Sequence, residues 1–143
     1  MHAASTISDM HIFSLERQGG RLQILRRDQH LLRRFGQLDL FELAAGQMTA
    51  FILRAEADEI WALLEGRVTV VLADRRPQSP SSALELRIDL DAAQPQGILI
   101  PFGVAHVFHA HTSARLLRLA THVDGSHRED EPFSIAEPIA PSG

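Results

Sequence analysis

The chain of 143 residues contains no cysteine, no tyrosine and no lysine, so that all 14 of its basic residues other than histidine are arginine. The absence of cysteine excludes disulfides, thiolate nucleophiles and thiolate-bound zinc. Without lysine there is no Schiff base or lysine general base, and without tyrosine no phenol can act as a general acid. Any acid–base or binding chemistry therefore depends on histidine, aspartate, glutamate, serine, threonine and arginine.

Long hydrophobic runs and an excess of positive charge are also missing. No apolar stretch approaches the roughly 20 residues of a membrane span, and the first residues, MHAASTISDM, lack the basic and apolar regions of a signal peptide. The net charge of −4 argues against a general nucleic-acid-binding protein, because affinity for phosphate backbones comes from clustered positive charge. We therefore expect a cytoplasmic protein with no membrane or nucleic-acid partner.

Short β-like runs, separated by Gly, Pro and Asp turns, occupy the middle of the chain. They predict strands at 11–15, 21–27, 36–43, 47–54, 58–64, 67–73, 83–90, 97–100, 104–111 and 114–122, with one helical turn at 29–34. Such regular spacing is typical of an all-β sandwich or barrel. We expect one domain at 11–123, between a flexible lead at 1–10 and a polar, proline-containing tail at 124–143.

Two sets of residues fall on the spacing of the two cupin motifs. The first set is Gly46, Glu59 and Gly66, and the second is Pro101, Gly103 and His106. The chain thus resembles the cupin superfamily. This resemblance implies a jelly-roll β-barrel, that is, an antiparallel β-sandwich.

The same resemblance shows what has been lost from the cupin metal site. Cupins hold a metal with two histidines and a glutamate from the first motif and one histidine from the second. In this chain the two first-motif histidines are replaced by Ile52 and Arg54, which leaves only Glu59 and His106. An isoleucine cannot ligate a metal, and an arginine would repel one. We therefore expect no metal and no cofactor.

Within that superfamily the chain is more similar to the dTDP-4-dehydrorhamnose 3,5-epimerase group, from about residue 20 to 128. The likeness rests on GRLQILRRD, GRVTVVLADRRPQSP, ILIPFGVAHVFHA and ARLLRLATHVD. These epimerases remove a proton next to a ketone with a histidine oriented by an aspartate, and reprotonate with a tyrosine. The resemblance places that histidine at Ile52 and that tyrosine at Arg118, so both groups are absent. Losing the base alone costs on the order of 10²–10⁴-fold in rate, and we do not expect ordinary 3,5-epimerisation.

Strand alternation indicates which side chains still face the barrel interior, because every second residue of a strand lies on the same face. The predicted ligand-binding residues are Arg54, Glu59, Trp61, His106, Arg118 and His122. Two guanidinium groups suit a carboxylate or a phosphate, and Trp61 suits stacking on a sugar or a base. His106 is the candidate catalytic base, and a histidine satisfied by backbone hydrogen bonds is the alternative.

The stretch ILIPFGVAHVFHAH carries two more histidines, His109 and His111. Because side chains alternate between the two faces of a strand, both of these histidines are expected to point away from the interior. On the outer face, a His-x-His pair could bind a surface metal. With no third ligand visible in the sequence, a half-buried polar position or a dimer face is the favoured interpretation.

Three hypotheses for function remain open. In the first, the chain is a divergent sugar-nucleotide isomerase or epimerase in which His106 or His122 replaces the lost base. In the second, it is a non-catalytic cupin that binds a sugar or a small anion. In the third, it is a structural dimer with a filled barrel. A cavity converging on Arg54, His106 and Arg118 would favour the first two. We also expect a homodimer through exchanged or paired edge strands.

Overall fold

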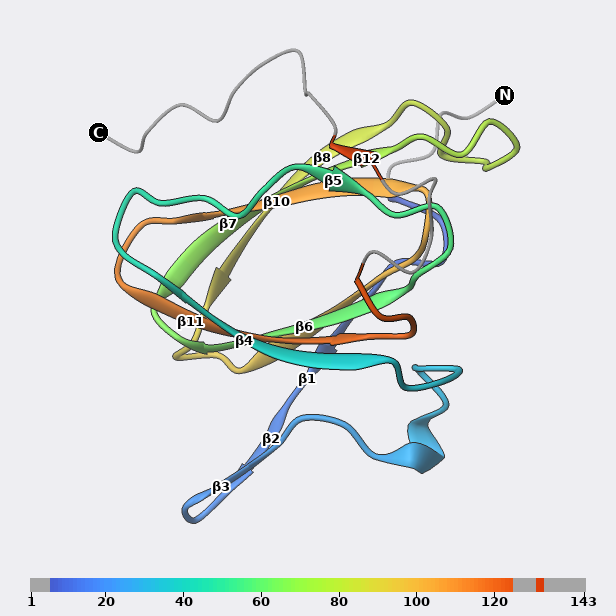
Figure 1. Cartoon of the computed structure of the whole chain (residues 1–143). Coiled ribbons are helices and arrows are strands. Elements are labelled where there is room, and N and C mark those ends of the chain that lie inside the picture. The colour runs from blue at the N-terminus through green and yellow to red at the C-terminus, as the bar shows by residue number, and fades with distance from the viewer. Residues whose placement is uncertain (1–5, 125–130, 133–143) are drawn as a thin grey trace.

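The computed structural model describes residues 6–124 and 131–132, which form two facing antiparallel β-sheets (Figure 1). One sheet has the strand order β1 (His11–Ser14), β9 (Gln96–Ile100), β6 (Glu59–Glu65), β11 (Ala114–Ala120) and β4 (Gln37–Leu43). The other has the order β12 (Glu131–Pro132), β5 (Ile52–Leu53), β10 (Val104–Ala110), β7 (Arg67–Asp74) and β8 (Glu85–Asp91). This arrangement confirms the predicted all-β sandwich of the jelly-roll type.

A small hairpin projects from the sandwich (Figure 1, bottom left). It consists of β2 (Glu16–Gln18) and β3 (Arg21–Gln23) and is followed by the 3₁₀-helix η1 (Arg27–Gln29). The sequence predicts a strand at 21–27 and a helical turn at 29–34; the strand is present only at Arg21–Gln23, and the turn lies two residues earlier than predicted. The turn ends early because His30 adopts a left-handed backbone, with φ of 53°. Within residues 6–124 and 131–132, no helix combines the length and apolar character that crossing a membrane requires.

The core lies between the sheets and is formed by alternate residues of their strands. Trp61 is 3% exposed, and its ring lies 4.5 Å from the Phe108 ring and 4.9 Å from the Phe41 ring, measured between centroids. Strand pairing places Arg118 directly opposite Trp61 and sets Ala120 opposite Glu59. The predicted inward faces of β6, β10 and β11 are therefore confirmed, and they bring polar residues to one end of the core.

Both predicted ends of the domain differ from expectation where the structure describes them. Ile7, placed in the flexible lead, is 2% exposed and belongs to the core cluster. Ser8 N–H donates to Ser81 Oγ at 2.8 Å. At the other end, β12 lies in the predicted tail but pairs with β5. The remaining parts of the lead and the tail, 1–5, 125–130 and 133–143, lie outside the described residues.

Candidate functional site

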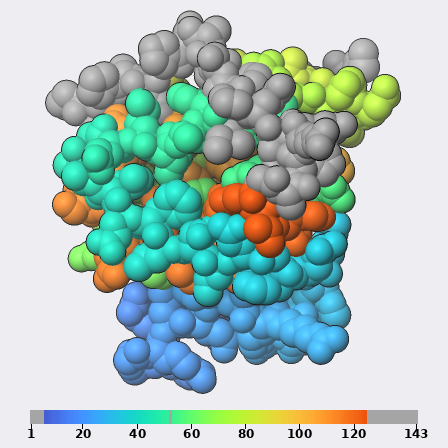
Figure 2. All heavy atoms as spheres, viewed as in Figure 1, coloured from blue at the N-terminus to red at the C-terminus, as the bar shows by residue number. Residues whose placement is uncertain are grey.

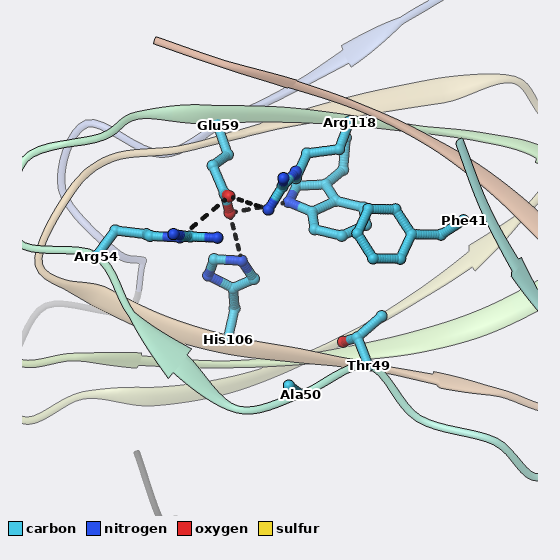
Figure 3. Close-up of a pocket in the computed structure, with 8 residues that line it drawn as sticks. Phe41, Thr49, Ala50, Arg54, Glu59, His106 and Arg118 are labelled. Atoms are coloured by element: carbon cyan, nitrogen blue, oxygen red, sulfur yellow. Dashed lines mark hydrogen bonds and ion pairs between the residues drawn. The ribbon is translucent and has the colours of Figure 1, made fainter. Parts of the chain in front are cut away.

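Five of the six predicted ligand-binding residues meet at the carboxylate of Glu59 (Figure 3). Glu59 begins β6, and His106 reaches it from β10 in the facing sheet, with Nε2 2.7 Å from Oε1. Arg118 of β11 places Nη1 3.1 Å from Oε2, and Arg54, just after β5, places Nε 3.5 Å from the same oxygen. Trp61 Nε1–H donates to Oε1 at 3.2 Å. The site therefore ties the two sheets together through one acid.

Glu59 is held ionised despite being only 1% exposed. Burial by itself would raise the pKa of its carboxyl group. The hydrogen-bonded His106 and the positive charges of Arg118 and Arg54 outweigh burial and lower the pKa to about 2, from an ordinary value of 4.5. An ionised carboxylate surrounded by cations is an acceptor only, so it organises the site and cannot act as a proton donor near neutral pH.

This pKa predicts a loss of stability in acid. Because the Glu59 carboxyl has a lower pKa in the folded chain than in the unfolded chain, its contribution to folding is complete above about pH 4.5 and disappears as the pH falls towards about 2. The contribution is about 3 kcal/mol, from a shift of roughly two to three pKa units. Urea unfolding at a series of pH values should show this loss, and the variant Glu59→Gln should lose less stability over the same interval. Equal pH dependence in the two proteins would contradict the assignment.

His106 has both ring nitrogens engaged. Nδ1 lies 3.2 Å from the carbonyl oxygen of Val104, and Nε2 lies 2.7 Å from Glu59 Oε1. Since both partners are acceptors, the two contacts are hydrogen bonds together only when both nitrogens carry a proton. In this conformation neither nitrogen is available to take a proton from a substrate.

The outer nitrogens of the two arginines form the mouth of the site. Arg118 Nη2 bonds to Asp39 Oδ2 on β4 and lies 2.6 Å from Asp124 Oδ2, while Arg54 Nη2 lies 2.8 Å from Asp124 Oδ1. Burial would lower the pKa of Arg118, but the hydrogen bond that it donates to Asp124, the charge of Glu59 and the hydrogen bond that it donates to Asp39 raise this pKa above its ordinary value. Figure 2 shows the orange-red end of the described chain at the surface beside the cyan segment that contains β4. Arg118 is thus held in its charged form, and the side chains of Arg54 and Arg118 are only 8% and 5% exposed.

A cavity of about 60 Å³ adjoins these groups. Its described lining consists of Phe41, Thr49, Ala50, Arg54, Glu59, Trp61, His106 and Arg118. The Nε of Arg118 is buried and has no hydrogen-bond partner in the part of the chain that the structure describes. The volume is enough for about two water molecules at ~30 Å³ each and is well below the roughly 300–1,000 Å³ of typical ligand pockets. Arg54, His106 and Arg118 line this small cavity, and the rings of Phe41 and Phe108 pack against Trp61 beside it.

The other predicted histidines lie elsewhere. His122 is not among the described residues that line the cavity, and its ring contacts Glu56 Oε1 at 3.2 Å and Thr121 Oγ1 at 2.8 Å. His109 lies on the outer face of β10, as predicted, but it is only 4% exposed. Its ring stacks edge-on against His111, with centroids 4.9 Å apart. Burial, and the neighbouring His111, lower the pKa of His109.

The residues at the cupin metal position do not fit a metal ion. Arg54 places a fixed positive charge beside Glu59, and Glu59 and His106, the two retained ligands, bond to each other at 2.7 Å. No group of three or more His, Cys, Asp or Glu side chains able to hold a metal occurs within residues 6–124 and 131–132. Arg54 thus supplies a positive charge next to the buried carboxylate of Glu59.

Sequence reasoning missed the acids at the mouth. Asp39 is not among the predicted ligand-binding residues, yet it bonds to Arg118. Its position two residues before Phe41 on the regular strand β4 was a usable signal, because the period of two puts both on the inner face. Asp124 was assigned to the tail, and because it lies beyond the end of β11 no strand period could have placed it.

A larger hollow, of about 670 Å³, lies outside the barrel at the Ser-Pro loop. Phe102, 45% exposed, and Arg76 line it. Arg76 is committed to a structural brace, because its guanidinium bonds to Asp74 at 3.0 Å and to Asp9 at 3.2 Å. Ser79 Oγ donates to the same Asp74 at 2.6 Å. The hollow has room for a ligand, but the positive charge of Arg76 is used to hold the Ser-Pro loop in place.

Comparisons with known proteins support the scaffold at the level of fold. No protein-family model matches the chain. A dTDP sugar isomerase from Desulfovibrio desulfuricans G20 superposes with a TM-score of 0.78 at 23% identity, covering 90% of this chain and 85% of that one. A dTDP-4-dehydrorhamnose 3,5-epimerase from Sulfolobus tokodaii gives 0.77 at 21% identity, covering 92% and 82%. The chain therefore has the fold of these proteins, and the resemblance predicted from its sequence is confirmed to that extent.

One curated protein is similar in sequence. The spore coat polysaccharide biosynthesis protein SpsL of Bacillus subtilis (strain 168) is 32% identical over 84 residues. The match covers 59% of this chain and 56% of SpsL, so it spans only about half of the relative's length.

Proposed function

We propose that the chain binds a keto-deoxy-sugar nucleotide or a related sugar, with the anionic part of the ligand at Arg54 and Arg118. The observation that carries this proposal is the convergence of two buried arginines with His106 and Trp61 on one cavity. Guanidinium groups bind phosphate and carboxylate through paired hydrogen bonds, and an indole suits a sugar face. The likeness to dTDP-sugar isomerases and epimerases, and to a polysaccharide biosynthesis protein, supports a sugar ligand.

The geometry favours binding without 3,5-epimerisation. The epimerase histidine and tyrosine correspond to Ile52 and Arg118 in the resemblance, and His106 has both nitrogens engaged. A general base must present a free nitrogen within hydrogen-bond reach of the proton that it removes. The cavity of about 60 Å³ also requires the mouth to open before a sugar can enter.

Isomerisation is the second candidate, and the Glu59–His106 pair is the observation that favours it. A carboxylate 2.7 Å from an imidazole orients the ring, as in other histidine-dependent enzymes. In such a reaction Nδ1 of His106 would first release the Val104 carbonyl and then remove the proton next to the ketone, and the cation of Arg118 would stabilise the enolate oxygen that forms. The proton would return to the same carbon or to its neighbour.

Binding is tested by titrating the protein with dTDP and a dTDP-4-keto-6-deoxy sugar in a calorimeter. We expect wild type to bind both, and Arg54→Gln to weaken binding at least 10-fold. Arg115→Gln is the matched control, since Arg115 is an exposed residue on the opposite face of β11 from Arg118. Loss of binding in Phe102→Ala instead would place the ligand in the larger hollow. No binding by wild type would refute the proposal and favour a structural dimer with a filled barrel.

Catalysis is tested by incubating the same sugar nucleotide with the protein in D₂O. NMR detects solvent deuterium that enters at C3 or C5. We expect no exchange above the protein-free background. Exchange in wild type that is abolished in His106→Gln would establish the isomerase candidate in place of the purely binding role.

We also propose that the chain forms a homodimer through β4. β4 is an edge strand of its sheet among the described residues, and it exposes Leu38 by 52% and Leu40 by 45%. Exposed apolar residues on an edge strand favour pairing with another chain. We expect light scattering to show a dimer that the double variant Leu38→Glu, Leu40→Glu converts to a monomer. Met48→Glu, at a residue also 45% exposed but outside β4, should remain dimeric. A monomeric wild type would refute this proposal.

A further inference from the structure

Asp124 bridges the two arginines in the way that an external anion would. Its Oδ1 lies 2.8 Å from Arg54 Nη2 and its Oδ2 lies 2.6 Å from Arg118 Nη2. The side chain of Asp124 is 42% exposed, whereas those of Arg54 and Arg118 are 8% and 5% exposed. One carboxylate oxygen per guanidinium is the arrangement that a bound carboxylate or phosphate adopts between two arginines.

The contacts of Asp124 are separable from those that hold the site together. Arg54 uses Nε, and Arg118 uses Nη1, to reach Glu59. Only the Nη2 atoms face Asp124, and Arg118 Nη2 also bonds to Asp39. If Asp124 left, the arginines would therefore keep their attachment to the buried acid.

Asp124 itself is held by a short polar anchor. Its backbone N–H donates to Gln37 Oε1 at 2.8 Å, and Gln37 Nε2 donates to its Oδ2 at 3.2 Å. Both hydrogen bonds are exposed to solvent, where water competes with each partner. An incoming anion with equal or greater charge can compete with a carboxylate held in this way.

The charges at the mouth also favour exchange of one anion for another. In the described part of the chain, the carboxylates of Glu59, Asp39 and Asp124 contact the guanidinium groups of Arg54 and Arg118. A further anion added to this set would be repelled by the carboxylates that already contact the two arginines. An anion that replaces Asp124 would leave the number of carboxylate-like groups unchanged.

We propose that the Nη2 atoms of Arg54 and Arg118 form an oxyanion site, that Asp124 occupies it in the free protein, and that a ligand phosphate or carboxylate enters by displacing Asp124. This deepens the proposed function and rests on its assignment of the two arginines to the anionic part of the ligand. Asp124 then competes with the ligand for the two arginines, and the apparent affinity for a ligand is lowered by the need to displace Asp124. Its displacement also opens the surface above the small cavity.

The test compares Asp124→Asn with Asp39→Asn, using inorganic phosphate as the probe in a calorimetric titration. Each variant removes one negative charge from Arg118, but only Asp124 bridges the two arginines. We expect Asp124→Asn to bind phosphate at least 10-fold more tightly than wild type, and Asp39→Asn to gain less than 3-fold. The double variant Arg54→Gln, Asp124→Asn should lose the gain. A parallel titration with acetate distinguishes a carboxylate-selective site from a phosphate-selective one.

Equal gains in the two single variants would overturn the proposal, because they would reflect net charge alone. An unchanged or weaker phosphate affinity in Asp124→Asn would overturn it as well, with circular dichroism confirming that the variant is folded. The same measurements can refute the proposed function independently of the oxyanion site. If Asp124→Asn gains affinity for phosphate while no variant binds the sugar nucleotide, the oxyanion site stands and the sugar-nucleotide assignment does not.

Discussion

Replacing Glu59 with alanine is expected to lower the free energy of unfolding by about 3 to 5 kcal/mol, the usual cost of removing one partner from a buried ion pair. Glu59 accepts bonds from His106, Arg118 and Trp61 and neutralises Arg54 nearby. Without it, buried cations face one another in a low-dielectric interior. Urea unfolding of the purified variant measures the loss.

Two variants define the cause of this loss. Glu59→Gln keeps the shape and one acceptor oxygen, so it should cost less than Glu59→Ala. Asp39→Asn removes a carboxylate that also contacts Arg118 but whose side chain is 32% exposed, and it should cost no more than about 1 kcal/mol. A loss below about 1 kcal/mol in Glu59→Ala would mean that the acids at the mouth suffice to balance the arginines.

The second large effect is expected from Gly66→Ala, at about 2 to 5 kcal/mol, as the sum of a left-handed backbone and overpacking. Gly66 joins β6 to β7 with φ of 90°. An added Cβ would lie 2.2 Å from the carbonyl oxygen of Ser113 and 2.8 Å from Thr112 Oγ1. Backbone on the neighbouring strand connection must therefore shift.

Gly46 provides a matched control for the Gly66 prediction. Its φ of 87° is nearly the same, but a Cβ there would meet nothing within 4 Å. Gly46→Ala should cost only about 1 to 2 kcal/mol, the backbone part alone. Chemical denaturation of both variants separates conformational strain from steric overlap. Equal losses of unfolding free energy in the two variants would show that the residues around Gly66 move to accommodate the added Cβ without a further energetic cost.

The period of β-strands made much of the site predictable. It placed Glu59 and Trp61 on one inner face, and His106 and Arg118 on the strands that meet them, because alternation fixes the face once one residue is assigned. The bridging role of Asp124 was not predictable in this way, since a residue beyond a strand end has no period. Cavity size was also beyond prediction, because it depends on how Phe41 and Phe108 pack against Trp61.

The motifs predicted the fold, but two of the predicted elements differ in extent from the observed ones because of local backbone geometry. The expected strand at 47–54 shortens to β5, and Met48 forms only an isolated bridge with His109. In the same way, the left-handed His30 ends the helical turn at Gln29, the first residue of the predicted turn at 29–34. Composition alone does not predict the backbone conformation of single residues such as these.

The hydrogen bond from Trp61 to Glu59 gives the protein an optical reporter of its own site. Trp61 is the single tryptophan in a chain without tyrosine, so almost all of its near-ultraviolet emission arises from one indole. That indole is 3% exposed, and its N–H lies 3.2 Å from the carboxylate at the centre of the charged cluster. Changes in emission wavelength or intensity will therefore follow protonation of the cluster and occupation of the cavity directly, without any added label.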